Sequence, residues 1–301
     1  MVIVSIYGGL GNQMFQYAFG RSLATRLDTD LKYDYSFNLR RKDFKQSDIV
    51  FLLDIFKLKI EHATIEEIRK FRVDNKVYRK AYIYLKNLIP SSIIRNKLIY
   101  ESTYDFHKSI LSSDYNYYVS GYWQSEKYFK DIISILKEEF KLQRPADLRN
   151  VDITEKIENS ESVSVHLRGR DYIANPATKK MHFTCNLSYY ERSFYYLTKV
   201  LKKNIHFFVF SDDHNWARSF LQTEYPFTIV EGNSWNKGSY EDLRLMSLCK
   251  HNIIANSSFS WWGAWLNQNP HKIVVAPQKW FNDPKLNIQS ADIVPSNWIR
   301  L

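Results

Sequence analysis

Cysteine is scarce in this chain of 301 residues, which contains only Cys185 and Cys249. Two cysteines cannot build a disulfide framework for a chain of this length, and both stand among apolar residues with helical spacing, so we expect reduced thiols. Neither cysteine has the spacing of a metal site. The sequence also lacks any uninterrupted run of roughly 20 apolar residues, and its start lacks a basic segment followed by an apolar signal core. We therefore expect a cytosolic globular protein.

Glycine is also scarce, with nine residues in the chain, yet three of them lie together at positions 8, 9 and 11. The β-branched run of residues 2–6 precedes them, and Phe15, Phe19, Leu23 and Leu27 recur every four residues after them. This pattern predicts a buried strand, a tight turn and a helix. Glycine lets backbone N–H groups approach a ligand at the positive end of a helix dipole, so the turn suits a phosphate or a sugar.

Two other interpretations of this turn remain open. A dinucleotide-binding turn would have glycines at its first, third and sixth positions; Gly9 and Gly11 fit, whereas Met14 stands in the sixth. Asp34, at the end of the next expected strand (residues 31–35), lies where a ribose-binding acid would stand. A nucleotide-dependent oxidoreductase is therefore one alternative, and a tight turn that binds nothing is the other.

The chain has fewer acidic than basic residues: 32 Asp and Glu against 42 Lys and Arg give a formal charge of +10. This charge predicts attraction to polyanions, which include nucleic acids, anionic lipid surfaces and nucleotide diphosphates. Aromatic residues form 16% of the chain and offer flat faces to sugars or bases, although most must serve packing. A nonenzymatic nucleic-acid binder is a further alternative, but the basic residues are spread along the chain and intermingled with acids.

From about residue 162, strands and helices alternate regularly. Expected strands cover residues 163–167, 205–210, 227–230, 252–255 and 273–276, and expected helices cover residues 188–203, 214–221, 239–250 and 260–268. Ser188 and Glu191 have the spacing of a capping box at the start of the first of these helices. Alternation of this kind predicts a parallel sheet covered on both faces.

The first half of the chain is less regular. After the opening strand, helix and strand, we expect a helix near residues 65–72, a strand at residues 117–120 and a helix over residues 127–142. The segment 144–147 contains a proline and is the expected boundary. We therefore predict two α/β domains, residues 1–145 and residues 146–301.

Polar residues cluster where three of the expected strands end. His166, Arg168 and Asp171 follow the first strand of the second half, Asp212 and Asp213 follow the second, and Asn256, Ser257, Ser258 and Phe259 follow the fourth. In open parallel sheets, ligands bind beyond the carboxyl ends of the strands. The convergence of three polar groups on one edge therefore predicts a binding site.

Taken together, these motifs resemble a known family. The turn at residues 8–13, the segments 121–125, 166–172, 210–213 and 242–247, and the Asn-Ser-Ser-Phe-Ser-Trp-Trp-Gly segment at residues 256–263 are similar to glycosyltransferase family 11, the α-1,2-fucosyltransferases. The resemblance covers nearly the whole chain. It implies a GT-B-type α/β fold, with two Rossmann-like domains whose parallel sheets face a central cleft. It also implies GDP-fucose as the donor, inversion at the sugar carbon, and no required metal or other cofactor.

The chemistry of such a transfer makes one residue central. Charge grows on the departing pyrophosphate as the glycosidic bond breaks, and either a divalent cation or fixed hydrogen-bond donors must stabilise it. Asp28 and Asp30 resemble a metal-binding pair, but they lie at a helix-to-strand junction and are expected to form a solvated turn. The planar fork of Arg168 can bond two phosphate oxygens, so Arg168 is the expected substitute for a metal. A structural ion pair between Arg168 and Asp171 is the alternative.

The resemblance also implies roles for individual residues. It places Arg168 on the β-phosphate, His166 beside guanine, Asp171 against Arg168 and the donor sugar, and Asn12 on the fucose or the diphosphate. The family usually has two adjacent arginines followed by glycine, whereas here glycine precedes arginine at positions 169 and 170. The role of Arg170 therefore stays open.

Other site residues follow from their chemistry. Guanine presents two adjacent N–H donors that one carboxylate can accept, and Asp212 or Asp213 fits this role while the other caps the next helix. Ser257 and Ser258 open a helix and can hold phosphates, with plain helix capping as the alternative. The remaining residues expected to bind the donor are Gly9, Gly11, Gln13, Asn256 and Phe259. The residues expected to form a platform for the acceptor are Tyr122, Trp123 and Gln124. For these three residues, ordinary packing is the alternative. No residue is assigned as a general base.

We therefore expect an inverting transferase that moves L-fucose from GDP-β-L-fucose to the 2-hydroxyl of a terminal β-galactose, on an oligosaccharide or a lipid-linked glycan such as an O-antigen. Residues 1–145 would form the acceptor-side domain and residues 146–301 the GDP-fucose-binding domain. The partners would be GDP-fucose and a galactose-terminated glycan, not nucleic acid. The basic charge would support peripheral association with the inner face of the cell membrane.

Overall fold

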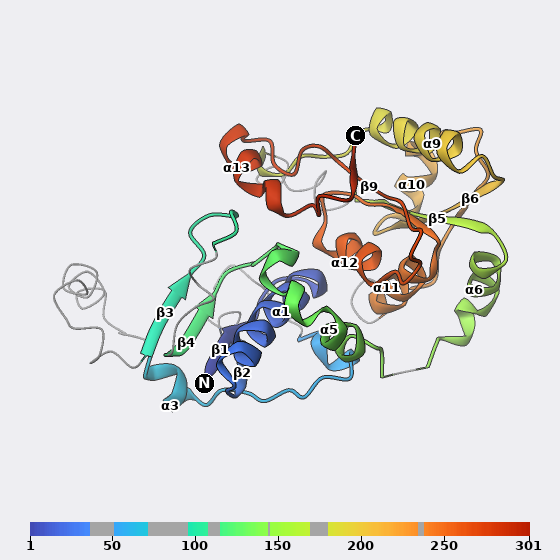
Figure 1. Ribbon diagram of the computed structural model, residues 1–301. Coiled ribbons are helices and arrows are strands. Elements are labelled where there is room, and N and C mark those ends of the chain that lie inside the picture. Colours follow the sequence, from blue (N-terminus) through green and yellow to red (C-terminus); the bar gives the residue numbers. More distant parts are fainter. Residues whose placement is uncertain (37–50, 72–95, 108–114, 144, 169–179, 234–237) are drawn as a thin grey trace. The chain divides into compact units, whose positions relative to one another are not determined.

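The structure, a computed structural model, describes residues 1–36, 51–71, 96–107, 115–143, 145–168, 180–233 and 238–301 (Figure 1). The chain forms two compact units, Met1–Gln143 (unit 1) and Arg144–Leu301 (unit 2). Each unit is built on its own parallel sheet, of four strands in unit 1 and six strands in unit 2. The expected α/β fold class is confirmed.

Unit 1 is a strand–helix–strand unit extended by two later strands. Its strands run in the order β2-β1-β4-β3, and every neighbouring pair is parallel. The carboxyl ends of β1, β3 and β4 therefore lie along one edge. The strands are β1 (Val2–Ser5), β2 (Leu31–Asp34), β3 (Asn96–Tyr100) and β4 (Asn116–Ser120); the helices are α1 (Leu10–Leu27), α3 (Ile65–Arg69) and α5 (Ile133–Glu139), with 3₁₀ turns η2 (Leu53–Ile55), η4 (Glu126–Tyr128) and η5 (Lys130–Ile132).

Two glycines shape the start of unit 1. Gly8 has a φ of 80°, a left-handed conformation that glycine adopts without strain. Gly20 lets α1 pack closely on β1, because a β-carbon there would lie 2.2 Å from Cγ2 of Val4. On the opposite face of the sheet, Ile3 packs with Ile68 of α3. The sheet of unit 1 is thus covered by α1 on one face and by α3 on the other.

The structure differs from the sequence-based expectation at two places in unit 1. It contains β3, an edge strand for which the sequence pattern predicts nothing. The helix expected over residues 127–142 is instead divided into η4, η5 and α5. Phe129 interrupts it with φ −134° and ψ 15°, outside the helical region. The spacing of Phe129, Ile132 and Leu136 suggests a helix because all three are buried, and the core accepts them despite the break.

Unit 2 contains six strands in the order β10-β9-β8-β5-β6-β7, again all parallel. The nine elements expected between residues 163 and 276 are all confirmed, with ends shifted by no more than two residues. The strands are β5 (Glu161–Leu167), β6 (Ile205–Ser211), β7 (Phe227–Ile229), β8 (His251–Ile253), β9 (Val274–Ala276) and β10 (Ile299–Arg300). The helices are α6 (Val151–Glu158), α9 (Leu187–Leu201), α10 (His214–Phe220), α11 (Ser239–Leu248), α12 (Ser258–Leu266) and α13 (Pro284–Gln289), with 3₁₀ turns η6 (Leu148–Asn150) and η7 (Ser290–Asp292).

Strand β6 shows how the sheet of unit 2 is covered. Phe207 packs with Phe194 of α9 in one core, and Phe208 packs with Leu245 of α11 in another. Successive residues of a strand point to opposite faces, so helices cover both faces of this sheet. The predicted double cover is confirmed.

The capping box expected at the start of α9 is wrong. Asn186 is the N-cap residue, and its side-chain oxygen accepts a hydrogen bond from the N–H of Tyr189 at 3.0 Å. Ser188 lies inside the helix, where its hydroxyl accepts a hydrogen bond from Arg192. Asparagine caps as well as serine, so the helix begins earlier than the serine–glutamate spacing indicates.

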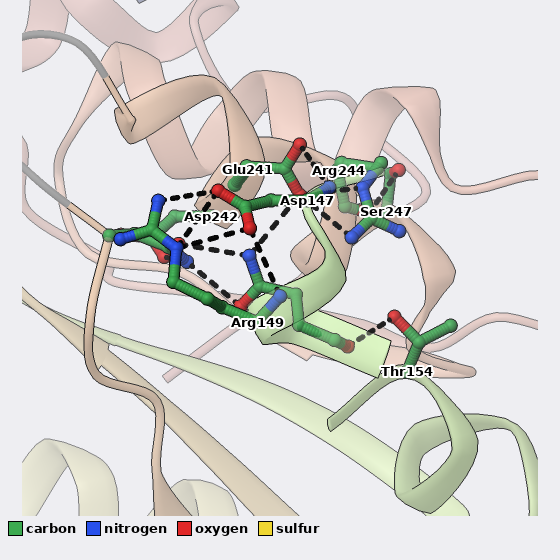
Figure 2. Close-up of polar contacts among 9 residues, drawn as sticks. Asp147, Arg149, Thr154, Glu241, Asp242, Arg244 and Ser247 are labelled. Atoms are coloured by element: carbon green, nitrogen blue, oxygen red, sulfur yellow. Dashed lines mark hydrogen bonds and ion pairs between the residues drawn. The ribbon is translucent and has the colours of Figure 1, made fainter. Parts of the chain in front are cut away.

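A polar network joins the first turn of unit 2 to α11 (Figure 2). Oε2 of Glu241 accepts two hydrogen bonds from Arg244, at 2.9 and 2.7 Å, and Oε1 accepts one from the N–H of Asp147 at 3.4 Å. Next to it, Asp242 accepts a hydrogen bond from Nδ2 of Asn233 at 2.7 Å, and burial raises the pKa of Asp242 to about 7. The first residue of the motif at residues 242–247, Asp242, is therefore a buried carboxyl group that forms a hydrogen bond within unit 2.

Cys185 and Cys249 are buried free thiols, as the sequence predicts. Burial raises the pKa of the Cys185 thiol to about 12. Within the ranges that the structure describes, no helix is both long enough and apolar enough to cross a membrane.

Candidate active site

Three ionisable side chains gather at the carboxyl edge of the unit 2 sheet. His166 lies on β5, Arg168 follows that strand, and Asp212 follows the neighbouring strand β6. The parallel register pairs Leu167 with Ser211, which brings the two strand ends together. Nε of Arg168 lies 3.9 Å from Oδ2 of Asp212, and the side chains of the two residues are 21% and 3% exposed. The guanidinium therefore has a buried carboxylate beside it and keeps part of its surface open.

His166 is buried behind this pair. Its ring centroid lies 5.9 Å from that of Phe259, and its Nδ1 has no hydrogen-bond partner among the described residues. Burial and the positive charge of Arg168 lower the pKa of His166 to about 3, against the opposing effect of Asp212. The ring is therefore neutral at pH 7 and offers one donor and one acceptor rather than a charge.

The low pKa of His166 predicts a loss of stability as the pH falls from 6.5 toward 3. In this window the unfolded chain binds a proton that the folded chain does not, and above it both states are neutral. Urea denaturation at about pH 5 and about pH 7.5 measures the difference, which His166→Gln should reduce. His182, His206 and His251 also have lowered pKa values and act in the same direction, whereas Glu101 and Asp242, whose pKa values burial raises to about 7, act in the opposite direction; His166→Gln removes the contribution of His166 alone. An unchanged pH dependence in His166→Gln would contradict the prediction.

The two aspartates after β6 differ in function. Oδ1 of Asp213 accepts a hydrogen bond from the N–H of Trp216 at 2.9 Å and so caps α10. Asp212 instead lies beside Arg168. Asp213 is thus a helix cap, and Asp212 is the candidate for donor binding.

Asn256 follows β8, but its side chain is used inside unit 2. It is 2% exposed, its Nδ2 donates hydrogen bonds to the carbonyls of Phe183 and Trp280, and its Oδ1 lies 3.9 Å from Sγ of Cys185. These contacts tie two loops to the end of the strand. Asn256 therefore supports the loops at this edge, and the donor contact expected of it stays a prediction.

Helix α12 begins at the same edge. Oγ of Ser257 accepts a hydrogen bond from the N–H of Phe259 at 3.4 Å, so Ser257 caps the helix. Ser258 and Phe259 are half-buried in its first turn, whereas Trp261 and Trp262 are fully buried in the core. A helix N-terminus carries partial positive charge, which favours a phosphate group at this edge.

His182 also belongs to this edge, although no motif in the sequence marks it. It forms a β-bridge with Phe281, and the two ring centroids lie 5.2 Å apart. Burial and the charge of Arg168 lower the pKa of His182. The histidine is therefore within electrostatic reach of the guanidinium.

In unit 1, the glycine turn connects β1 to α1. Gly9 is the exposed N-cap of the helix, and Gly11 is buried in its first turn. Asn12 is half-buried, and its Oδ1 accepts a hydrogen bond from Nε2 of Gln124 at 2.8 Å. This bond joins the segments that follow β1 and β4.

Gln13 is fully buried below the turn. Its Nε2 donates a hydrogen bond to the carbonyl of Gly8 at 2.8 Å, and its Oε1 accepts one from the N–H of Leu52 at 2.9 Å. Both ends of its amide thus form hydrogen bonds within unit 1, and the donor contact expected of Gln13 stays a prediction.

Trp123 is also a core residue. It is 0% exposed, and its ring stacks on that of Phe19 of α1 with centroids 4.1 Å apart. This packing is the alternative that the sequence left open for Trp123, and its contact with an acceptor stays a prediction. Tyr122 and Gln124 on either side of it are half-buried and remain candidates.

Three further residues lie at the edge of unit 1, and the sequence analysis predicts none of them as site residues: Tyr7, Glu101 and Tyr104. The ring centroid of Tyr7, after β1, lies 5.2 Å from that of Tyr122 in an edge-on arrangement. Glu101 follows β3 and accepts hydrogen bonds from two backbone N–H groups of the turn after β4. Burial raises the pKa of Glu101 to about 7, and burial with nearby Tyr122 raises that of Tyr104 to about 12.

Asp171 and Arg170 lie outside the described residues. Asp34, the acid that a dinucleotide site would need, is buried, and its carboxylate accepts hydrogen bonds from the hydroxyl of Tyr118 at 2.7 Å and the N–H of Ser36 at 2.8 Å. Within the described part of the chain, no three His, Cys, Asp or Glu side chains gather as a metal site.

The sequence profile described as Glycosyl transferase family 11 matches residues 1–301. The chain belongs to this family. Two curated relatives from Escherichia coli are similar over their full lengths. An alpha-1,2-colitosyltransferase is 33% identical over 308 residues, which cover 100% of this chain and 99% of the relative. The O-antigen biosynthesis glycosyltransferase WbnK is 33% identical over 315 residues, which cover 98% of each chain.

Among solved structures, a mutant of Arabidopsis thaliana FUT1 in complex with GDP is similar to the present chain, with a TM-score of 0.53. The alignment has 12% identity and covers 91% of this chain and 69% of the other. A likeness at this identity concerns the fold, and it agrees with two units on parallel sheets. The predicted GT-B-type fold is confirmed.

Proposed function

We propose that the protein is an inverting, metal-independent transferase that moves L-fucose from GDP-β-L-fucose to the 2-hydroxyl of a terminal β-galactose. The observation that carries this proposal is the position of Arg168 at the end of β5, partly open and beside the buried Asp212. Membership of family 11 supports a sugar transfer.

The donor would bind at the edge of unit 2. Arg168 would stabilise the β-phosphate as the bond between C1 of fucose and the phosphate oxygen breaks and the electron pair passes to GDP. Ser257 and Ser258 at the start of α12 would receive other phosphate oxygens. His166 and Phe259 would line the guanine, and Asp212 would accept its adjacent N–H groups. Asp171 is proposed to orient Arg168 and to contact the donor sugar.

The acceptor would bind at the edge of unit 1. Tyr122 and Gln124 would hold the galactose, and Asn12 would contact the fucose or the diphosphate. The oxygen of the 2-hydroxyl would attack C1 from the face opposite GDP, so the configuration at C1 inverts, and the hydroxyl proton would pass to water. We propose the cytoplasmic face of the membrane as the place of action, since the formal charge of +10 favours an anionic surface.

Colitose is a second candidate donor sugar, because a relative that is 33% identical over the whole chain is a colitosyltransferase. Colitose lacks the 3-hydroxyl of fucose. A site that hydrogen-bonds this hydroxyl would reject the deoxy sugar strongly, because its polar groups would be left without a partner.

Sugar transfer by the purified protein tests the proposal. GDP-fucose and GDP-colitose are each offered with a panel of β-galactosides, with and without EDTA, and the product linkage is determined by NMR. We expect an α-1,2-linked product from GDP-fucose at a rate that EDTA does not change; transfer from GDP-colitose alone would favour the second candidate instead. Absence of transfer from both donors, another linkage or a loss of activity in EDTA would refute the proposal. Calorimetry should also show binding of GDP, and no binding of NAD(H) or of oligonucleotides.

A further inference from the structure

The turn of residues 121–124, which we name the acceptor turn, has an unusual backbone. Trp123 has a φ of 55°, in the left-handed region that bulky residues rarely adopt. Such a conformation persists only where the surrounding structure holds it, and it is frequent at functional sites. The buried ring of Trp123 anchors the turn from below.

Glu101 holds the acceptor turn from the side. Its Oε2 accepts a hydrogen bond from the N–H of Tyr122 at 2.6 Å, and its Oε1 accepts one from the N–H of Trp123 at 3.0 Å. Two successive N–H groups that point at one carboxylate form a small anion-binding nest. Gly121 packs directly on Glu101, because a β-carbon on the glycine would lie 2.4 Å from Cβ of Glu101.

The acceptor turn presents its polar groups beside the glycine turn. Gln124 donates its hydrogen bond to Asn12, and the ring of Tyr122 lies against that of Tyr7. The half-buried tyrosines offer aromatic faces and hydroxyl groups, which suit the two faces of a sugar ring.

We propose that Glu101 is a positioning residue for the acceptor: its carboxylate holds the acceptor turn so that Tyr122 and Gln124 receive the incoming sugar. This inference rests on the proposed function, in which unit 1 binds the galactoside. The role belongs to the ionised carboxylate, since only this form can accept both backbone N–H groups without a competing proton.

The environment of Glu101 gives this role a pH dependence. Among the described residues, the hydroxyl groups of Tyr7 after β1 and Tyr104 after β3 interact electrostatically with Glu101, whereas Tyr122 after β4 meets it through its backbone N–H. Burial raises the pKa of Tyr104 to about 12 and also raises the pKa of Tyr7, so both hydroxyl groups stay neutral near pH 7. Burial raises the pKa of Glu101 to about 7. Glu101 therefore takes up a proton below this pH, and one of the two hydrogen bonds to the turn is lost.

Glu101→Gln is the main test. The amide keeps the size of the side chain but replaces one acceptor with a donor that faces an N–H group. We expect the KM for the galactoside to rise about tenfold or more, while the KM for the GDP-sugar stays within about twofold. Glu138→Gln is the matched control, because Glu138 is an exposed glutamate of the same unit that pairs with Lys141 on the surface. It should leave both constants unchanged.

The pH profile separates positioning from a general loss of structure. In the wild type, the KM for the galactoside should rise as the pH falls through about 7. This rise should be absent in Glu101→Gln and present in Glu101→Asp, which keeps a shorter carboxylate. Hydrogen exchange of the Tyr122 and Trp123 amides should be slow in the wild type and faster in Glu101→Gln.

Several results would overturn the inference. One such result is a Glu101→Gln variant with the wild-type KM for the galactoside. If that variant does not fold, a KM for the galactoside that does not change with pH in either the wild type or Glu101→Asp would equally contradict the inference. Unprotected Tyr122 and Trp123 amides in the wild type would overturn it without any activity assay. The proposed function fails differently, through absence of sugar transfer by the wild-type protein itself.

Discussion

Replacing Arg168 with alanine is expected to lower kcat for sugar transfer by about 100- to 1,000-fold, the loss typical when one fixed donor to a developing negative charge is removed. The charge on the β-phosphate is largest in the transition state, so the effect should fall on kcat more than on the KM for the donor. Arg168→Lys should recover only part of the rate, because an ammonium cannot bond two phosphate oxygens in the geometry of the planar fork. Steady-state kinetics with the GDP-sugar and a galactoside measure these changes.

Arg218 provides the matched control for Arg168. Its side chain is exposed and pairs with Glu231 on the surface of the same unit. Arg218→Ala should therefore leave kcat unchanged, and thermal unfolding should show that both variants fold. Activity of Arg168→Ala within a few-fold of the wild type would remove this residue from the proposed mechanism.

Trp123→Ala is expected to lower the free energy of unfolding by about 3 to 5 kcal/mol, as is typical when a large buried aromatic side chain is truncated. The ring has no exposed surface, stacks on Phe19 and meets Tyr128 edge-on at a centroid distance of 5.7 Å. Alanine at this position would leave a cavity between α1 and the turn that follows β4. Urea denaturation followed by circular dichroism measures the loss.

The neighbouring residue gives the comparison for Trp123. Tyr122 is only half-buried, so Tyr122→Ala should cost less stability and should instead raise the KM for the galactoside. The assignment of Trp123 to the core would be incorrect if Trp123→Ala destabilised the protein by less than about 1 kcal/mol.

The sequence predicts the second half of the chain well because its apolar strands alternate regularly with amphipathic helices. Strand β6 is apolar on both faces and is followed by two aspartates, so both its position and the polar end of the strand can be recognised. The same reasoning fails for β3, which is an edge strand. Without β3, nothing in the sequence indicates that Glu101 stands at the end of a parallel strand.

Residue type at a strand end also does not show where a side chain points. Gln13, Trp123 and Asn256 all stand in loops or turns at the correct edges, yet all three are buried. The side-chain amides of Gln13 and Asn256 form hydrogen bonds with the backbone of nearby loops, and the ring of Trp123 packs in the core. Tertiary structure, not residue type, sets these positions. Whether a polar residue faces a ligand or supports the backbone therefore requires the structure.

Each of the two sheets has its own hydrophobic core and its own row of polar strand ends. Under the proposed division of labour, a mutation that changes preference for the transferred sugar need not disturb recognition of the sugar that receives it. Under this division, substitutions at the edge of one sheet could change one of the two specificities and leave the other unaltered.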